Sequence, residues 1–202
     1  MGPAKSRCLV MLVTLLAQLT LAGCLSSIEP DVDLTPSLTE DTTYYEVLTK
    51  STIKRTVFKN FETRAIVSAT YLSPEFRAAF SERLERVFKR GDLHFDEAKD
   101  KAAFFVSVEV PGLDMERADI TNPYHWSVML NGDQGPIKPI LIKRIVDKER
   151  WRAFFVNVNN WSSEYLVIFD VPAVNANSPK MVVKTPVRLT IANADAQLNL
   201  SW

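Results

Sequence analysis

The sequence predicts a fold of the α+β class that is mostly β, in which an antiparallel sandwich of short strands carries one amphipathic helix. Short segments rich in β-branched and aromatic residues recur after residue 100, and turn residues separate them. Residues 73–90 instead have apolar side chains at helical spacing. Hydrophobic residues make up 47% of the 202-residue chain, so we expect a substantial core.

The segment before this helix is harder to assign. Residues 44–58 fit a helical face only in part, whereas β-branched residues become dense from Thr52 onward and residues 64–72 have strand propensity. We therefore expect a helical turn or a strand first, followed by two strands that connect at Asn60-Phe61-Glu62.

The helix at residues 73–90 is the clearest element of the sequence. Ser73 suits the N-cap, Pro74 suits the first helical position and Gly91 suits the end. One face of this helix is apolar and consists of Phe76, Phe80, Leu84, Val87 and Phe88. Because the opposite face mixes both signs of charge, we expect a helix packed on a sheet rather than one that binds a membrane or a partner.

Strands are expected through the rest of the chain. The predicted segments are 103–110, 125–130, 135–145, 152–158, 164–172, 180–184, 187–194 and 196–202. Asn131-Gly132 predicts a turn between the second and third of these segments. Apolar and polar residues alternate in the last two, with the final strand reaching Trp202. Many short strands separated by turn residues are typical of an antiparallel sandwich.

The first 23 residues have the pattern of a secretory signal peptide. Lys5 and Arg7 precede a mostly apolar run over residues 8–22, and a basic head followed by such a run is characteristic of these signals. The run is too short for a membrane span, which needs about 20 apolar residues. Cys8 leaves with this segment, so Cys24 is the one thiol after it and no disulfide is expected.

The end of this segment, Leu21-Ala22-Gly23-Cys24, resembles the lipobox of bacterial lipoprotein precursors. The small residues Ala22 and Gly23 give a peptidase access to the next bond, and the Cys24 thiol is a nucleophile that can carry diacylglycerol. The resemblance implies cleavage before Cys24, with lipid on its sulfur and its new amino group. An ordinary signal peptide with an incidental Cys24 is the alternative. Several acyl chains, at about 0.8 kcal/mol per buried CH₂, would anchor the chain firmly.

The residues after Cys24 predict where the anchor lies and how the domain is attached. Leu25 stands where an aspartate would retain enterobacterial lipoproteins in the inner membrane, so the resemblance implies the outer membrane, with the periplasmic or outer face left open. Residues 25–40 are rich in Ser, Thr, Pro and acids and predict a flexible tether spanning about 20–25 Å; a segment docked on the domain is the alternative. We therefore expect a signal peptide (1–23), a lipidated tether (24–40) and one globular domain (41–202).

The predicted domain also resembles uncharacterised proteobacterial lipoproteins. In that group a stretch similar to ATYLSPEFRAAF (69–80) precedes an immunoglobulin-like sandwich, and a final strand ends in tryptophan, as AQLNLSW (196–202) does here. The resemblance implies an immunoglobulin-like arrangement of the sandwich, and it implies no activity.

Catalytic groups are scarce in this sequence. It has no nucleophile elbow, no metalloprotease motif and no phosphate-binding loop. Its charges balance at 24 basic and 24 acidic residues, which gives no electrostatic basis for binding nucleic acid. Asp92, His94 and Asp96 would point to one side of an extended segment and could hold a divalent cation, but we favour a polar loop after the helix, with Leu93 and Phe95 turned inward. We predict no enzyme, no cofactor and no resident metal.

Aromatic residues are the remaining candidates for binding. Trp161 lies in NNWSSEY, between two predicted strands, and is expected to be exposed. Trp126 and Tyr165 are expected to join it at a ligand-binding face, because Trp and Tyr are strong interface residues; packing in the core is the alternative. We predict a non-enzymatic envelope protein that binds a protein partner, or alternatively one that binds a glycan or another small ligand.

Overall fold

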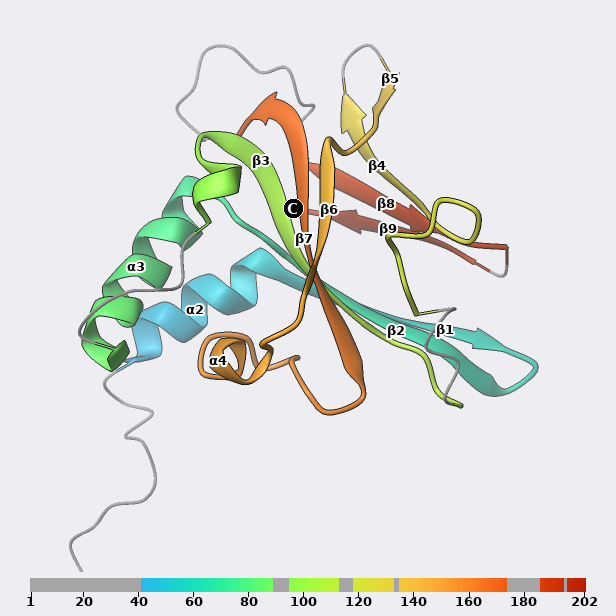
Figure 1. Ribbon diagram of the computed structural model, residues 1–202, viewed down its shortest axis with the longest axis horizontal. Helices are drawn as coiled ribbons and strands as arrows, with labels where there is room; N and C mark the ends of the chain where they lie inside the picture. The colour runs from blue at the N-terminus through green and yellow to red at the C-terminus, as the bar shows by residue number, and fades with distance from the viewer. Residues whose placement is uncertain (1–40, 89–94, 113–117, 133–134, 174–185, 195) are drawn as a thin grey trace, which may run out of the picture. The chain divides into compact units, whose positions relative to one another are not determined.

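The computed structural model describes residues 41–88, 95–112, 118–132, 135–173, 186–194 and 196–202. Strands hold 46% of these residues and helices 23%, which confirms the mostly β class. Figure 1 shows the elements, which in chain order are α2 (Thr42–Ser51), β1 (Thr52–Lys59), β2 (Glu62–Tyr71), α3 (Pro74–Phe88), η3 (Asp96–Ala98), β3 (Lys101–Glu109), β4 (Ser127–Gly132), β5 (Gly135–Ile137), β6 (Leu141–Ile145), α4 (Glu149–Arg152), β7 (Ser162–Pro172), β8 (Arg188–Ala192) and β9 (Gln197–Ser201).

The strands form two antiparallel sheets. The first has the order β1-β2-β3-β7-β6 and the second has the order β5-β4-β8-β9. Their facing sides share one core, to which β3 contributes Phe104 and Val106 and β8 contributes Leu189 and Ile191. The alternation predicted for β8 and β9 is confirmed, since Leu189, Ile191 and Leu200 are buried while their neighbours are more exposed.

A second core lies between the first sheet and the helices α2 and α3. Phe76, Phe80 and Leu84 of α3 are buried there together with Phe105 of β3 and Ile168 of β7. The strands β3 and β7 are therefore buried on both faces, which explains their nearly continuous apolar sequence. The helix starts as predicted, because the backbone N–H of Phe76 donates to Ser73 Oγ at 3.1 Å; its predicted end at Gly91 lies outside the described residues.

The strand pair predicted before α3 is confirmed as the hairpin of β1 and β2. Asn60 and Phe61 connect the two strands with φ values of 53° and 63°, which is the left-handed backbone that type I′ hairpin turns require. Ahead of β1, the ambiguous segment forms the helix α2. Trp202 is tied to the junction between α2 and β1, because its indole Nε1 donates to Ser51 O at 2.7 Å.

Two predictions around residue 132 are wrong. Asn131 and Gly132 do not form the turn; they lie in β4 and pair with Pro136 and Gly135 of β5. Position 132 favours glycine because a Cβ there would lie 2.9 Å from the backbone oxygen of Gly135, in addition to 2.6 Å from the end of the Ile137 side chain. The predicted strand at 135–145 is divided, since β5 belongs to the second sheet whereas β6 pairs with β7 in the first.

The strand predicted at 152–158 is also wrong. Its apolar run follows the short helix α4 as a series of turns. Phe154 and Phe155 are buried against the helices instead of in a sheet, and the phenol of Tyr44 donates to Phe154 O at 2.8 Å. The high strand propensity of this run thus reflects its apolar side chains. The strand predicted at 180–184 lies outside the described residues.

Candidate functional site

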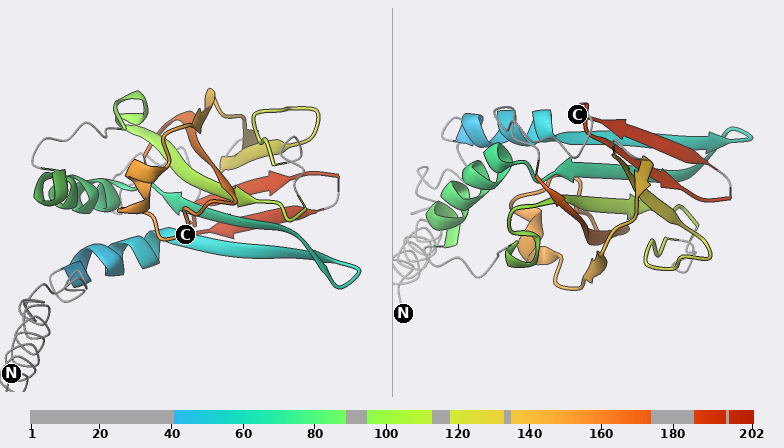
Figure 2. Two further views of the ribbon diagram at one scale, coloured as in Figure 1. Left: turned by 60° about the horizontal axis from the view of Figure 1, so that its bottom comes forward. Right: turned by 90° about the horizontal axis from the view of Figure 1, so that it is seen from above.

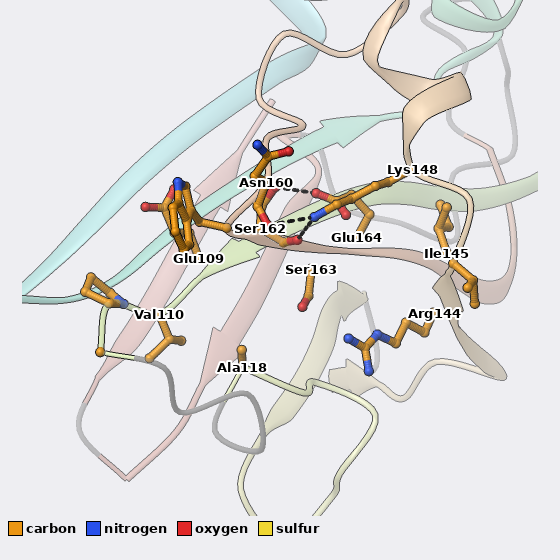
Figure 3. A pocket seen from close by; sticks show the side chains of 14 residues that line it. Glu109, Val110, Ala118, Arg144, Ile145, Lys148, Asn160, Ser162, Ser163 and Glu164 are labelled. Atoms are coloured by element: carbon orange, nitrogen blue, oxygen red, sulfur yellow. Dashed lines mark hydrogen bonds between the residues drawn. The ribbon is translucent and has the colours of Figure 1, made fainter.

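A pocket of about 850 Å³ opens where the ends of β3 and β6 meet the start of β7 (Figure 3). Its walls combine apolar and charged side chains. The lining residues are Glu109, Val110, Pro111, Gly112, Ala118, Arg144, Ile145, Val146, Lys148, Asn160, Trp161, Ser162, Ser163 and Glu164. The pairing of Ile145 with Glu164 and of Glu109 with Ser162 brings these distant segments together.

The turn that carries Trp161 is held in place by two groups. The side-chain oxygen of Asn159 accepts from the backbone N–H groups of Trp161 at 2.7 Å and Ser162 at 3.0 Å. From the other side, Lys148 Nζ donates to the carbonyl oxygens of Asn159 (2.8 Å), Asn160 (3.1 Å) and Ser162 (2.9 Å). The Trp161 side chain, 74% exposed, therefore stands on a fixed backbone at the pocket.

Two carboxylates line this pocket in different environments. Glu109 accepts from the side-chain amide of Asn159 at 3.2 Å. Glu164 is buried and accepts from the hydroxyl of Ser162. Burial raises the pKa of Glu164, an effect that the Ser162 hydrogen bond and the positive charge of Lys148 oppose.

The two cations of the pocket differ in what they contact. Lys148 is fully engaged, because its three donors each meet a carbonyl oxygen. The Arg144 side chain extends from β6 toward Ser163, and both point into the space opposite Val110 and Ala118 (Figure 3). The positive charge of Arg144 acts on the carboxylates of Asp119 and Glu164, where it opposes the effect of burial on their pKa, and a guanidinium is suited to bind a carboxylate or phosphate of a ligand.

The three predicted ligand-binding aromatics do not form one face. Trp161 is exposed, as predicted from its place before β7. Trp126 and Tyr165 are buried in the core between the sheets, and the phenol of Tyr165 donates to Ala118 O at 3.0 Å. The prediction that these two residues contact a ligand beside Trp161 is therefore corrected: Tyr165 supports the pocket-lining Ala118 from the core, and Trp126 is a core residue.

Other predicted site residues lie mostly outside the described residues. Cys24, Asp92 and His94 are among those, and Asp96 begins the short helix η3. Within the residues that the structure does describe, no group of three or more histidine, cysteine or acidic side chains is arranged to hold a metal ion. Over the same residues, no helix has the length and apolarity needed to cross a membrane.

Arg144, Lys148 and Glu164 were not identified from the sequence. Each falls in or beside a segment whose pairing partner is distant, and no local motif marks them. Comparison with known proteins adds no candidate, because no family model, curated protein or solved structure matches the chain.

Proposed function

We propose that the chain is a lipid-anchored lipoprotein of the bacterial outer membrane, and that its domain is a non-enzymatic module that binds an envelope protein. The lipobox Leu21-Ala22-Gly23-Cys24 supports the anchor. The test is mass spectrometry of the peptide that begins at Cys24 in protein purified from cells. A diacylglyceryl adduct is expected on the thiol, and Cys24→Ser should release the chain from membranes. An unmodified thiol in the cleaved chain would refute the anchor.

The binding role rests on one observation, the exposed Trp161 on a fixed turn beside the pocket. Exposed tryptophan beside apolar surface is characteristic of interface residues that dominate binding energy. Val146 is also exposed at this pocket, and Val110 and Ile145 are partly buried there. A side chain of a protein partner would enter the pocket, while the Trp161 ring covers the contact.

Site-specific photocrosslinking in living cells tests this role. A photoreactive residue at position 146 should capture one defined envelope protein, and capture should fail when the same chain carries Trp161→Ala. The matched control places the photoreactive residue at position 82, which is exposed on α3. Capture of the same species from both positions, or capture that persists without Trp161, would refute partner binding at the pocket.

Binding of a glycan or another small ligand is the second candidate. It is favoured by the polar groups beside Trp161, namely Asn160, Ser163 and Arg144. In this case Trp161→Ala should abolish retention on immobilised envelope glycan while the unfolding midpoint stays unchanged. Equal retention of both proteins would exclude this candidate.

An immunoglobulin-like arrangement is part of the same proposal. It is supported by two antiparallel sheets with a shared core. The strand order is a point of difference, because β1, β2 and β3 follow one another as neighbours, whereas the first sheet of an immunoglobulin constant domain has the order A-B-E-D.

A further inference from the structure

The tip of the β1–β2 hairpin, residues 58–61, presents two phenylalanines to solvent. Phe58 is 68% exposed and Phe61 is fully exposed. Phe61 also has a φ of 63°, a left-handed conformation that is unfavourable for a bulky residue. Type I′ turns prefer glycine at this position, after asparagine. The sequence therefore gives up stability at Phe61, and the folded domain gains no buried surface from its ring.

The hairpin also extends beyond the strand next to it, and its side chains from Phe58 to Glu62 are exposed. Among the described residues, pairing of β2 with β3 extends only from Ile66 to Tyr71, and residues 62–65 of β2 pair with β1 alone. Figure 2 shows this two-stranded ribbon projecting beyond the other strands. A specific protein interface buries about 800 Å² on each partner, which is more than a four-residue tip presents. The small apolar area of the tip suits insertion into a deformable surface, such as a lipid layer, better than it suits a protein interface.

The charge of the hairpin identifies that surface. Residues 52–71 contain four basic side chains, Lys54, Arg55, Lys59 and Arg64, and one acidic side chain, Glu62. This local excess stands out in a chain with 24 basic and 24 acidic residues. Aromatic rings flanked by basic groups suit the boundary between anionic headgroups and acyl chains.

We propose that the hairpin tip docks on a phospholipid bilayer with anionic headgroups. Phe58 and Phe61 enter the headgroup–acyl boundary, and Lys54, Arg55 and Lys59 contact lipid phosphates, whereas Arg64 pairs with Glu62 at 3.0 Å. A single small insertion binds weakly, and the inference rests on the proposed function in that the lipid anchor holds the chain on one bilayer while the tip contacts a second. The tip lies at the end of β1 remote from α2 (Figure 2), and so presents itself to a surface away from Asp41.

The test separates the anchor from the hairpin by using two populations of vesicles. The full chain, purified from cells, is first incorporated through its anchor into phosphatidylcholine vesicles. Dye-filled vesicles of phosphatidylcholine, with or without 30% phosphatidylglycerol (roughly an anionic leaflet's charge), are then added and their capture is measured. We expect capture of the anionic vesicles only, and loss of capture when salt is raised.

Phe61→Gly is the decisive variant because it should weaken vesicle capture while it stabilises the fold. Capture of anionic vesicles should fall about tenfold, as expected for the loss of a buried phenyl ring, while the unfolding temperature rises. Val156→Ser is the control at another exposed apolar side chain, since Val156 is 68% exposed on a different loop, and it should leave capture unchanged.

The possible results distinguish failure of the hairpin docking from failure of the proposed anchor. Unchanged capture by Phe61→Gly, or equal capture of neutral vesicles, overturns docking by the hairpin. A chain that fails to enter the first vesicles refutes the proposed anchor instead. In that case sedimentation of the chain with anionic vesicles, with and without Phe61→Gly, tests the hairpin directly: equal sedimentation of both proteins overturns docking, and weaker sedimentation of the variant supports it.

Discussion

Replacing Arg83 by methionine should weaken the contact between α2 and α3 far more than the same change at Arg86. Both guanidinium groups pair with the carboxylate of Asp41. The Arg83 side chain is 10% exposed, whereas that of Arg86 is 46% exposed. The two variants thus remove one partner of the same carboxylate in two different environments.

The expected cost follows from what Arg83 contacts. Its Nη2 donates to Ala153 O at 2.9 Å, and its guanidinium lies 4.7 Å from the Tyr44 ring centroid and 4.9 Å from that of Tyr45. Leaving a carbonyl without its donor costs about 1–3 kcal/mol, and a cation–π contact contributes about 0.5–1 kcal/mol. Because Arg86 still pairs with Asp41 at 2.7 Å, we expect Arg83→Met to lower the free energy of unfolding by about 2–3 kcal/mol.

Urea unfolding followed by tryptophan fluorescence measures this difference. Arg86→Met should cost less than about 1 kcal/mol, as is usual for exposed ion pairs. Both variants should keep the slope of the unfolding free energy against urea, since neither changes the surface that unfolding exposes. Equal costs for the two variants would refute the assignment of Arg83 as the buried link between the helices.

Three further predictions concern the pocket and the core beneath the helices. The raised pKa of Glu164 means that the folded protein holds this proton more tightly, so its contribution to stability falls as pH rises from 4.5 through the raised value. Glu164→Gln should remove this part of the pH dependence of the unfolding free energy; an unchanged pH profile would contradict it. Lys148→Met should leave three carbonyl groups without a donor and cost about 1–3 kcal/mol, with faster hydrogen exchange at residues 159–162; unaltered exchange there would argue against Lys148 as the support of the Trp161 turn. Phe105→Ala should cost about 3–5 kcal/mol in urea unfolding, because the ring stacks on Phe155 with centroids 3.8 Å apart; a cost below 1 kcal/mol, roughly the value for an exposed site, would exclude this stack from the core.

The sequence was sufficient to predict those elements whose structure depends on neighbouring residues alone. The helix α3 was predictable because Ser73, Pro74 and the apolar spacing all act within the helix. The hairpin at Asn60 and Phe61 was predictable from two strands and the residues that join them. The exposure of Trp161 followed from its position immediately before a strand.

The features that the sequence did not predict depend on contacts between segments that are distant along the chain. Residues 152–158 are as apolar as a buried strand, and only their packing on Phe76 and Phe105 distinguishes them. The pocket forms because β6 pairs with β7, which sets Arg144 opposite Tyr165. Neither residue carries a motif for this pairing, and so the charged side of the pocket was not predictable from the sequence.

The direct passage from α2 into β1 determines how the domain would respond to mechanical tension. The helix ends at Ser51 and the strand begins at Thr52, so a pull between Asp41 and the hairpin tip runs along one continuous stretch of backbone. The helical hydrogen bonds of α2 lie parallel to this pull, and unwinding of the helix must also break the pairing of Asp41 with Arg83 and the bond from Tyr44 to Phe154 O. Unwinding its ten residues lengthens the chain by roughly 20 Å.

Extension would stop at the bond from Trp202 to Ser51, beyond which β1 is loaded in shear along β2. The pocket between β3, β6 and β7 lies off this line of force, but Tyr44 of α2 bonds Phe154 O, so unwinding of α2 would free the segment that leads into the Trp161 turn.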